Sequence, residues 1–176
     1  MSKSSKLNGD SEEETSYYKY TGKYKLFDQK LFEKYDIPAR NVLKNCLGDK
    51  VDDNPNIYTQ DMIINIMDTK YKYVELQVCT NWSGNRFPHS NPYIYERKGT
   101  YGDDTLFIIF NKYFNSGYMF DGAAIKGTKC QRLKKYSRFF VHFVPWYKIR
   151  QFGLHDLEEV FNNFINKNKI TTTISQ

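Results

Sequence analysis

Residues 73–78, YVELQV, alternate apolar and polar side chains and place an acid inside a stretch that otherwise reads as buried. Successive side chains of a β-strand point to opposite faces of the sheet. Val74, Leu76 and Val78 therefore form a core face, and Glu75 and Gln77 lie together on the opposite face. The segment predicts a strand with one face that packs in the core and one polar face that is a candidate for a functional site.

The residues before this strand favour a hairpin. Residues 59–67 are strand-like, and residues 68–70 carry the composition of a three-residue turn. The register that this turn sets places Asp61 opposite Gln77, with Glu75 as its diagonal neighbour. Diagonal neighbours across a hairpin are about 7 Å or less apart at Cβ, so the three side chains converge.

Two carboxylates at that separation repel each other, and a hard divalent cation removes the penalty. We therefore expect Asp61 and Glu75 to bind Mg²⁺ or Mn²⁺. Two alternatives remain open. An edge hairpin would turn Glu75 and Gln77 to water, and a slip of register would bring Asp52 or Asp53 into the place of Asp61.

The flanking segments predict a mixed fold. Helical periodicity covers 26–35, with Asp28 near its start, and a second short helix begins at Pro38, buries Ile37, Val42, Leu43 and Cys46, and ends at Gly48. Residues 48–56 read as a loop. The remaining elements are three strands and a final amphipathic helix, which cover 105–114, 118–125, 138–149 and 154–168. The fold class is α/β (α+β), with a mixed central sheet flanked by helices.

The arrangement of Asp61, Glu75 and Gln77 resembles the PD-(D/E)xK, or restriction-endonuclease-like, nuclease superfamily. In that superfamily an Asp opens the second core strand and an acid-x-Lys follows on the third. The resemblance covers most of the chain beyond its first residues. Gln77 departs from the pattern because it stands where the family usually has Lys.

The resemblance implies hydrolysis of DNA phosphodiester bonds. It assigns Asp61, Glu75 and the Leu76 carbonyl to the metal, and Gln77 to the position of the catalytic Lys. It also implies that Glu33, on the preceding helix, is the additional acid of some members. A few restriction enzymes are similar in having Gln at this position, although an uncharged amide cannot stabilise the phosphate as an ammonium does.

Charge and composition bear on partners. The chain of 176 residues has a net charge of +6, which favours polyanions. Residues 80–102 mix Asn81, Arg86, Arg97 and Lys98 with aromatic side chains, and residues 126–138 contain six basic residues and no acid. From these segments we expect nucleic-acid contacts, by Asn81, Arg86, Arg97, Lys98, Lys129, Arg132, Lys134, Lys135 and Arg138. The alternatives are a surface loop pinned by its own aromatics and a solvated connector.

Length and patterning predict one domain over 17–170, between a polar N-terminal tail (1–16) and a C-terminal tail (171–176). No apolar run is long enough for a signal peptide or a membrane span, so we expect no membrane partner. Three cysteines without ligand spacing favour a reducing intracellular compartment over a disulfide framework.

A rival function belongs to a different class. The AT-biased composition and the short charged tail resemble those of proteins of large DNA viruses. The alternative is therefore a non-catalytic structural or nucleic-acid-binding protein of a larger assembly such as a virion, with a degenerate nuclease-like fold. For either function, the expected partners include a second copy of the chain in a homodimer, or a larger assembly.

Overall fold

The structure is a computed structural model that describes residues 18–21, 24–133 and 139–167. It is a mixed α+β fold around a six-stranded sheet. The strands of this sheet run in the order β11 (Arg150–Gly153), β8 (Ser116–Asp121), β7 (Thr105–Asn111), β5 (Tyr73–Cys79), β4 (Met62–Ile64) and β3 (Val51–Asp53). Only β5 and β7 pair in parallel; the other neighbours in this sheet are antiparallel.

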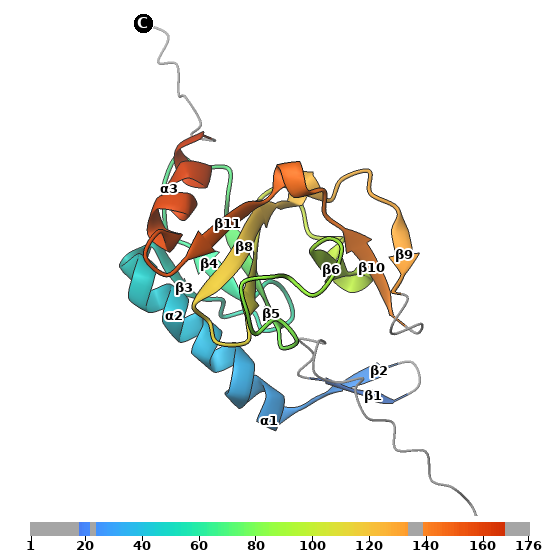
Figure 1. Ribbon diagram of the computed structural model, residues 1–176. Coiled ribbons are helices and arrows are strands. Elements are labelled where there is room, and N and C mark those ends of the chain that lie inside the picture. The colour runs from blue at the N-terminus through green and yellow to red at the C-terminus, as the bar shows by residue number, and fades with distance from the viewer. Residues whose placement is uncertain (1–17, 22–23, 134–138, 168–176) are drawn as a thin grey trace, which may run out of the picture.

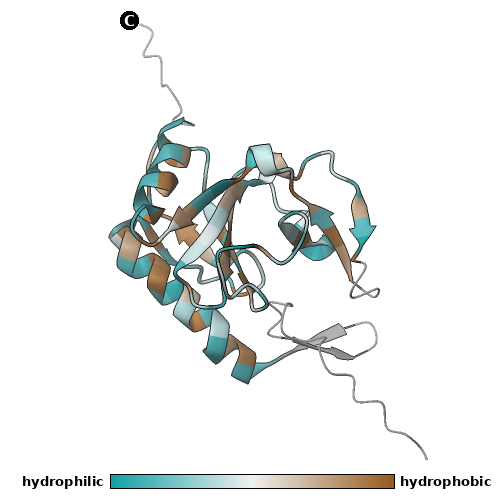
Figure 2. Cartoon of the chain, viewed as in Figure 1, coloured by the Kyte–Doolittle hydropathy of each residue, from teal (hydrophilic) through white to brown (hydrophobic). Residues whose placement is uncertain are grey.

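Two helices cover one face of the sheet (Figure 1). They are α2 (Ile37–Leu47) and α3 (Leu157–Lys167), and their buried residues join the core face of β5 in one apolar cluster. The predicted stripe of α3 is confirmed, with Leu157, Phe161 and Ile165 fully buried. Figure 2 shows hydrophilic residues alternating with hydrophobic ones along both helices. This is the pattern of helices with one face on a core.

The opposite face of the sheet is covered by a smaller sheet (Figure 1). Its strands run in the order β6 (Tyr93–Tyr95), β10 (Phe140–Phe143) and β9 (Cys130–Arg132). A second apolar cluster fills the space between, and includes Trp82, Ile94, Phe107, Phe120 and Val144. β5 therefore has packed layers on both of its faces.

The remaining elements are short. They comprise the hairpin of β1 (Tyr18–Thr21) and β2 (Tyr24–Phe27), the helical turn α1 (Gln29–Leu31), a π-helical turn η1 (Phe32–Asp36), and the 3₁₀ turns η2 (Gly48–Lys50), η3 (Glu96–Lys98), η4 (Gly122–Ala124) and η5 (Trp146–Lys148). Within the described ranges, no helix is long and apolar enough to cross a bilayer.

The predicted N-terminal helices are one continuous helical segment. Asp28 caps its start by accepting hydrogen bonds from the amides of Lys30 and Leu31, so residues 26 and 27 fall in β2 and not in a helix. Gly48, with φ of 60°, ends the segment as predicted. Ile37 was expected to be buried but is exposed, because η1 changes the phase of the helix before α2 begins.

The strand predictions differ from the structure in their extents. The expected loop 48–56 contains β3, and the expected loop 80–102 contains β6 and η3. The expected strand 138–149 is divided into β10 and η5, and β11 follows it. The hairpin around Asn115 is confirmed as β7 and β8. The expected tails, residues 1–16 and 171–176, lie outside the described residues.

The hairpin register is shifted by two residues from the prediction. Met62 pairs with Val74 and Ile63 pairs with Tyr73, because eight residues and not three connect β4 to β5. The predicted turn residue Asp68 does lie in this connection, with φ of 60°. A shift of two residues changes the partners but keeps every side chain on its predicted face.

Candidate active site

Glu75 and Gln77 are buried on the face of β5 that is opposite the helices. They do not face water, because β5 is a central strand between β4 and β7 and its far face is covered by residues of the crossover that leads to β7. The Gln77 amide donates to the Tyr93 carbonyl oxygen at 3.1 Å. The edge-hairpin alternative is therefore wrong.

The site forms where β4 stops pairing with β5. Met62 and Val74 are the last pair of their ladder, so the backbone of Leu76 extends past the start of β4. The Asp61 carboxylate, directly before β4, accepts a hydrogen bond from the Leu76 N–H at 2.8 Å. Asp61 is thus brought to the residue next to Glu75, in agreement with the predicted convergence. Gln77 is not part of this contact and bonds to β6 instead.

Lys98 completes the same gap in the ladder. Its ammonium donates to the Leu76 carbonyl oxygen at 2.8 Å and lies 2.8 Å from Glu75 Oε1. The Lys98 side chain is buried, so it does not lie on the exposed loop surface where the prediction placed it. Parallel strands require a long crossover, and here the crossover between β5 and β7 folds η3 back over Glu75.

Sequence reasoning named Lys98 only as a surface contact and missed its pairing with Glu75, because nothing local marks this lysine as buried. One signal was available, since a buried acid on a central strand requires a nearby cation and Gln77 does not supply one. The search for that cation would have included Arg97 and Lys98 in the segment that follows the strand.

Arg40 holds the other acid of the pair. From α2 it reaches Asp61 Oδ1 at 2.9 Å, and it also donates to the Asp61 carbonyl oxygen. Its Nε lies 2.6 Å from the fully buried Asp36, and a further contact reaches Asp53 at 3.3 Å. Burial lowers the pKa of Arg40, but Asp61 and Asp36 outweigh it, so the guanidinium stays charged. Asp53 is a neighbour of Asp61 and does not replace it.

Glu33 is not at the site. Its carboxylate is exposed and accepts a hydrogen bond from the Gln29 side chain at 2.6 Å. The buried acid of this helical segment is Asp36, which is linked to Asp61 through Arg40. The prediction for Glu33 is therefore wrong, and the buried acid of this segment lies three residues later, at Asp36.

A cavity of about 640 Å³ gives access to Asp61. Asp36, Arg40 and Asp61 line it, and the exposed side chains of Ile57 and Tyr58 lie at its border. Glu75 does not line this cavity, and its side chain is only 5% exposed. A ligand would therefore meet Asp61 before it meets Glu75.

The charge state of Glu75 reflects its burial. Desolvation, followed by the charge of Asp61, raises the pKa of Glu75 from 4.5 to about 7, although Lys98 acts in the opposite direction. Within the described part of the chain Glu75 Oε2 makes no hydrogen bond. The carboxylate thus has one oxygen on Lys98 and one that is free to accept a cation or a proton.

These groups fit a divalent cation of the Mg²⁺ type. Such ions bind through one or two carboxylates and take their remaining ligands from water or phosphate. Asp61, the unbonded Glu75 Oε2 and the Leu76 carbonyl are oxygen donors of this kind at neighbouring positions, although Lys98 already donates to that carbonyl. The residues that the structure describes hold no group of three or more His, Cys, Asp or Glu side chains around a common point.

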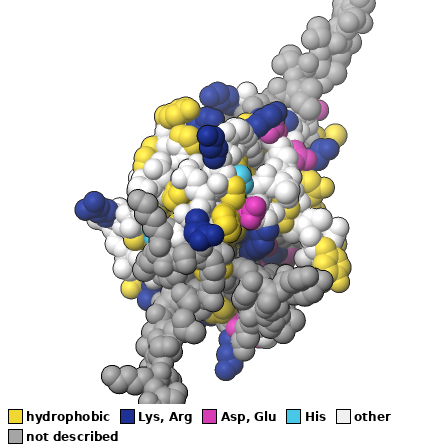
Figure 3. Space-filling model, turned by 90° about the vertical axis from the view of Figure 1, so that its right-hand side faces the viewer, with side chains coloured by type: hydrophobic (Ala, Val, Ile, Leu, Met, Phe, Trp, Pro, Cys, Tyr) yellow, Lys and Arg dark blue, Asp and Glu magenta, His cyan; other side chains and the backbone are white. Residues whose placement is uncertain are grey.

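The predicted nucleic-acid contacts are dispersed. Arg86, Arg97, Lys129 and Arg132 are exposed and Asn81 is half-buried. Lys134, Lys135 and Arg138 lie outside the described residues. On the face in Figure 3, which bears part of the smaller sheet, Lys and Arg side chains are spread singly among polar and apolar ones.

The aromatic side chains of 80–102 pack inward. Trp82, Phe87, Tyr93 and Tyr95 are buried, and Trp82 stacks on Tyr118 with ring centroids 4.6 Å apart. They are not available to stack on bases, as the pinned-loop alternative expected. None of the three cysteines is in a disulfide among the described residues; Cys79 is buried and Cys130 is exposed.

Comparison with protein-family models gives no match for this chain, and no curated protein is significantly similar to it.

Proposed function

We propose that the protein is a metal-dependent nuclease that hydrolyses phosphodiester bonds of DNA. The observation that carries this proposal is the convergence of Asp61, Glu75 and Lys98 on the backbone of Leu76. Two carboxylates can hold a divalent cation and an ammonium can offset charge on a phosphate, which are the contributions that metal-dependent phosphodiester hydrolysis uses.

The order of the elements supports a restriction-endonuclease-like fold. β3, β4 and β5 are consecutive antiparallel strands that follow α2. Asp61 directly precedes the second of these strands, and Glu75 lies on the third. This agrees with the positions of the Asp and of the acid-x-Lys motif in the superfamily that the sequence resembles.

Lys98 accounts for the departure at Gln77. The ammonium that the family pattern has two residues after the acid reaches Glu75 here from the crossover, at 2.8 Å from Oε1. A positive charge at this point can stabilise the charge that develops on the phosphate, which Gln77 cannot do. We therefore assign to Lys98 the role that the pattern gives to the missing lysine.

Asp61, Glu75 and the Leu76 carbonyl would hold the cation. When bound, a divalent ion activates water as the nucleophile and offsets charge on the phosphate. Arg40 and Leu76 N–H orient the Asp61 carboxylate, and Lys98 orients that of Glu75.

Incubation of the purified protein with plasmid DNA and with RNA, in Mg²⁺, Mn²⁺ or EDTA, tests the proposal. We expect metal-dependent cleavage of DNA. Glu75→Ala and Lys98→Met should each lower the rate by at least about a hundredfold while DNA binding is retained. Glu159→Gln, which removes an exposed acid on α3, is the matched control and should cleave as the wild type does.

Two results would contradict the proposal. Metal-independent cleavage, or cleavage that survives Glu75→Ala, would place the activity elsewhere. Cleavage of RNA alone would overturn the assignment to DNA.

A second candidate is a non-catalytic protein on the same scaffold. It is favoured by one observation, which is that each acid already has a protein cation, Arg40 on Asp61 and Lys98 on Glu75. In that case the pairs close the gap in the ladder and serve stability. Absence of cleavage in every metal, together with a large loss of stability in Lys98→Met, would favour this candidate.

A further inference from the structure

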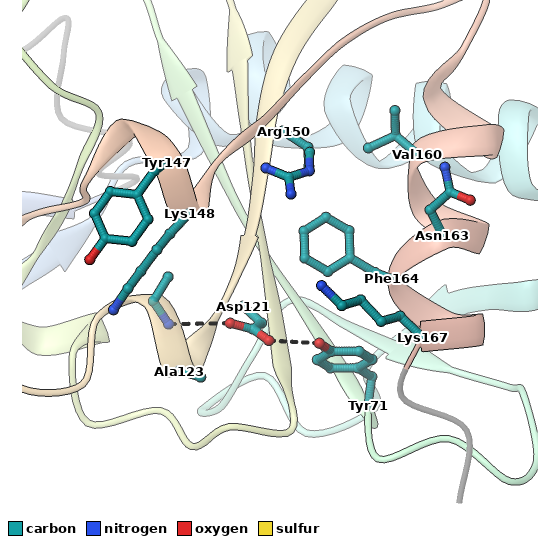
Figure 4. A pocket seen from close by; sticks show the side chains of 11 residues that line it. Tyr71, Asp121, Ala123, Tyr147, Lys148, Arg150, Val160, Asn163, Phe164 and Lys167 are labelled. Carbon is teal, nitrogen blue, oxygen red and sulfur yellow. Dashed lines mark hydrogen bonds between the residues drawn. The ribbon is translucent and has the colours of Figure 1, made fainter.

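A second cavity shares no lining residue with the cavity beside Asp61. Its volume is about 490 Å³, within the range of roughly 300–1,000 Å³ typical of small-molecule sites. The lining side chains that matter to the argument come from η5, β11 and α3, and are Tyr147, Lys148, Arg150, Asn163, Phe164 and Lys167 (Figure 4). We infer that this cavity binds the phosphate groups of a nucleotide.

Three cations from three elements surround the hollow. They are Lys148, Arg150 and Lys167, and within the described residues no carboxylate forms an ion pair with any of them. Arg150 donates one N–H to the carbonyl oxygen of Ile149, which leaves other donors of its guanidinium for a ligand. Like charges around one space repel each other, and an anion between them relieves the repulsion.

The one acid in the lining does not neutralise these cations. Asp121 accepts hydrogen bonds from the Tyr71 hydroxyl at 2.7 Å and from the Ala124 amide at 3.2 Å. Its carboxylate also lies 3.5 Å from Lys70 Nζ. The Asp121 carboxylate is therefore already bonded to residues of the cavity wall, and Lys70 offsets its charge. The lining keeps a positive excess.

Aromatic rings make the site suitable for more than a bare phosphate. In Figure 4 the ring of Phe164 lies between the side chains of Arg150 and Lys167, and Tyr147 stands at the other end of the cavity. Tyr147 is 77% exposed, so its ring is accessible to a ligand. Stacking of a base on an aromatic ring adds affinity whatever the base, and cations that face the phosphates add affinity through charge-assisted hydrogen bonds.

The inference does not depend on cleavage. The lining shares no residue with Asp61, Glu75 and Lys98 or with the cavity beside Asp61. The phosphates can come from a free nucleotide or from the end of a nucleic-acid chain, which present the same chemistry. The experiment therefore includes both sources.

Isothermal titration of the full-length protein in EDTA provides the test, with ATP, inorganic pyrophosphate and a 5′-phosphorylated oligonucleotide as probes. We expect ATP to bind, and Arg150→Gln and Lys167→Gln each to weaken it by about tenfold to a hundredfold. Tyr147→Ala should weaken ATP but leave pyrophosphate unchanged. Lys112→Gln, an exposed lysine outside the cavity, is the matched control.

The outcomes separate the sources. Binding of the oligonucleotide alone, weakened by Arg150→Gln, supports the site and assigns it to a nucleic-acid end. Absence of binding for all three probes at millimolar concentration, or binding that neither substitution weakens, overturns the inference. Arg150 and Lys167 are exposed, so thermal melting should show both variants folded. EDTA excludes cleavage, so failure here leaves the proposed nuclease function unaffected.

Discussion

Glu75 and Lys98 form an ion pair with side-chain exposures of 5% and 4%. The buried carboxylate is removed from solvent. Its Oε1 atom pairs with Lys98, and its Oε2 atom makes no hydrogen bond within the described residues. A pair of this kind gives little net stability relative to an apolar pair, but removal of one partner leaves an uncompensated buried charge. Single substitutions at these positions are therefore informative about structure as well as activity.

Lys98→Met should lower the free energy of unfolding by about 3–5 kcal/mol, because Glu75 would stay buried without its cation. Urea denaturation measures the change. Lys50→Met is the control, since the Lys50–Glu158 pair is more exposed and its loss should cost about 1 kcal/mol or less. A loss in Lys98→Met that is no larger than in Lys50→Met would contradict the burial of the pair.

The raised pKa of Glu75 predicts a pH dependence of stability. The folded state binds the Glu75 proton more tightly than the unfolded state, so it takes up protons between pH 4.5 and about 7. The resulting stability is fully present below pH 4.5 and is lost as the pH rises through about 7. Glu75→Gln lacks this contribution.

Urea denaturation of wild type and Glu75→Gln at several pH values across this window is the measurement. The stability of the wild type relative to the variant should decline as the pH rises. Parallel profiles would show that Glu75 keeps an ordinary pKa in the folded protein.

Among the elements, β8 is confined on both sides. It pairs with β7 on one side and β11 on the other, and Gly117 lies opposite Phe110 and Phe152. A Cβ at Gly117 would overlap the Phe152 ring and come to 2.5 Å from the Ile109 carbonyl oxygen. The backbone oxygen cannot move without breaking the strand pairing, so only glycine fits here.

Gly117→Ala should therefore destabilise the protein by about 1–3 kcal/mol, the range typical of overpacking. Gly84→Ala provides the contrast, since nothing lies within 4 Å of a Cβ at that position. The measurement is the melting temperature of each variant relative to that of the wild type, and only Gly117→Ala should lower it. Equal melting temperatures would mean that β8 and β11 separate more readily than their packing indicates.

At the scale of the whole molecule, the net charge of +6 does not form one visible patch on the face in Figure 3. Within the described residues, the exposed basic side chains of the β9 region are Lys126, Lys129 and Arg132, and the Lys126 ammonium lies 3.9 Å from the Asp103 carboxylate. Contacts by such side chains would be electrostatic and insensitive to sequence.

Replacement of these three residues by Gln should weaken DNA binding and reduce the slope of log K against log salt concentration by about 2 to 3. Fluorescence anisotropy with labelled duplex DNA at several salt concentrations measures the slope. The control is a triple Lys→Gln variant at Lys30, Lys72 and Lys112, which are exposed elsewhere. An equal change in both variants would mean that binding follows net charge and not the β9 region.

Sequence periodicity by itself determined which side chains share a face. The alternation in β5, the apolar stripe of α3, the caps at Asp28 and Gly48, and the placement of Asp61 beside Glu75 follow from rules that act over a few neighbouring residues. The two-residue error in register did not change which side chains were predicted to share a face, because a shift of two residues keeps each side chain on the same face of its strand.

Only the tertiary structure decided which cation meets Glu75. The crossover between the parallel strands β5 and β7 folds Lys98 into the gap beyond β4, and α2 brings Arg40 to Asp61. Local propensity carries no information about such contacts, since they depend on how layers pack and on which backbone groups a short strand leaves unpaired. The positions of Asp61 and Glu75 could therefore be predicted from the sequence, whereas the buried Asp36 and the cations that pair with these acids could not.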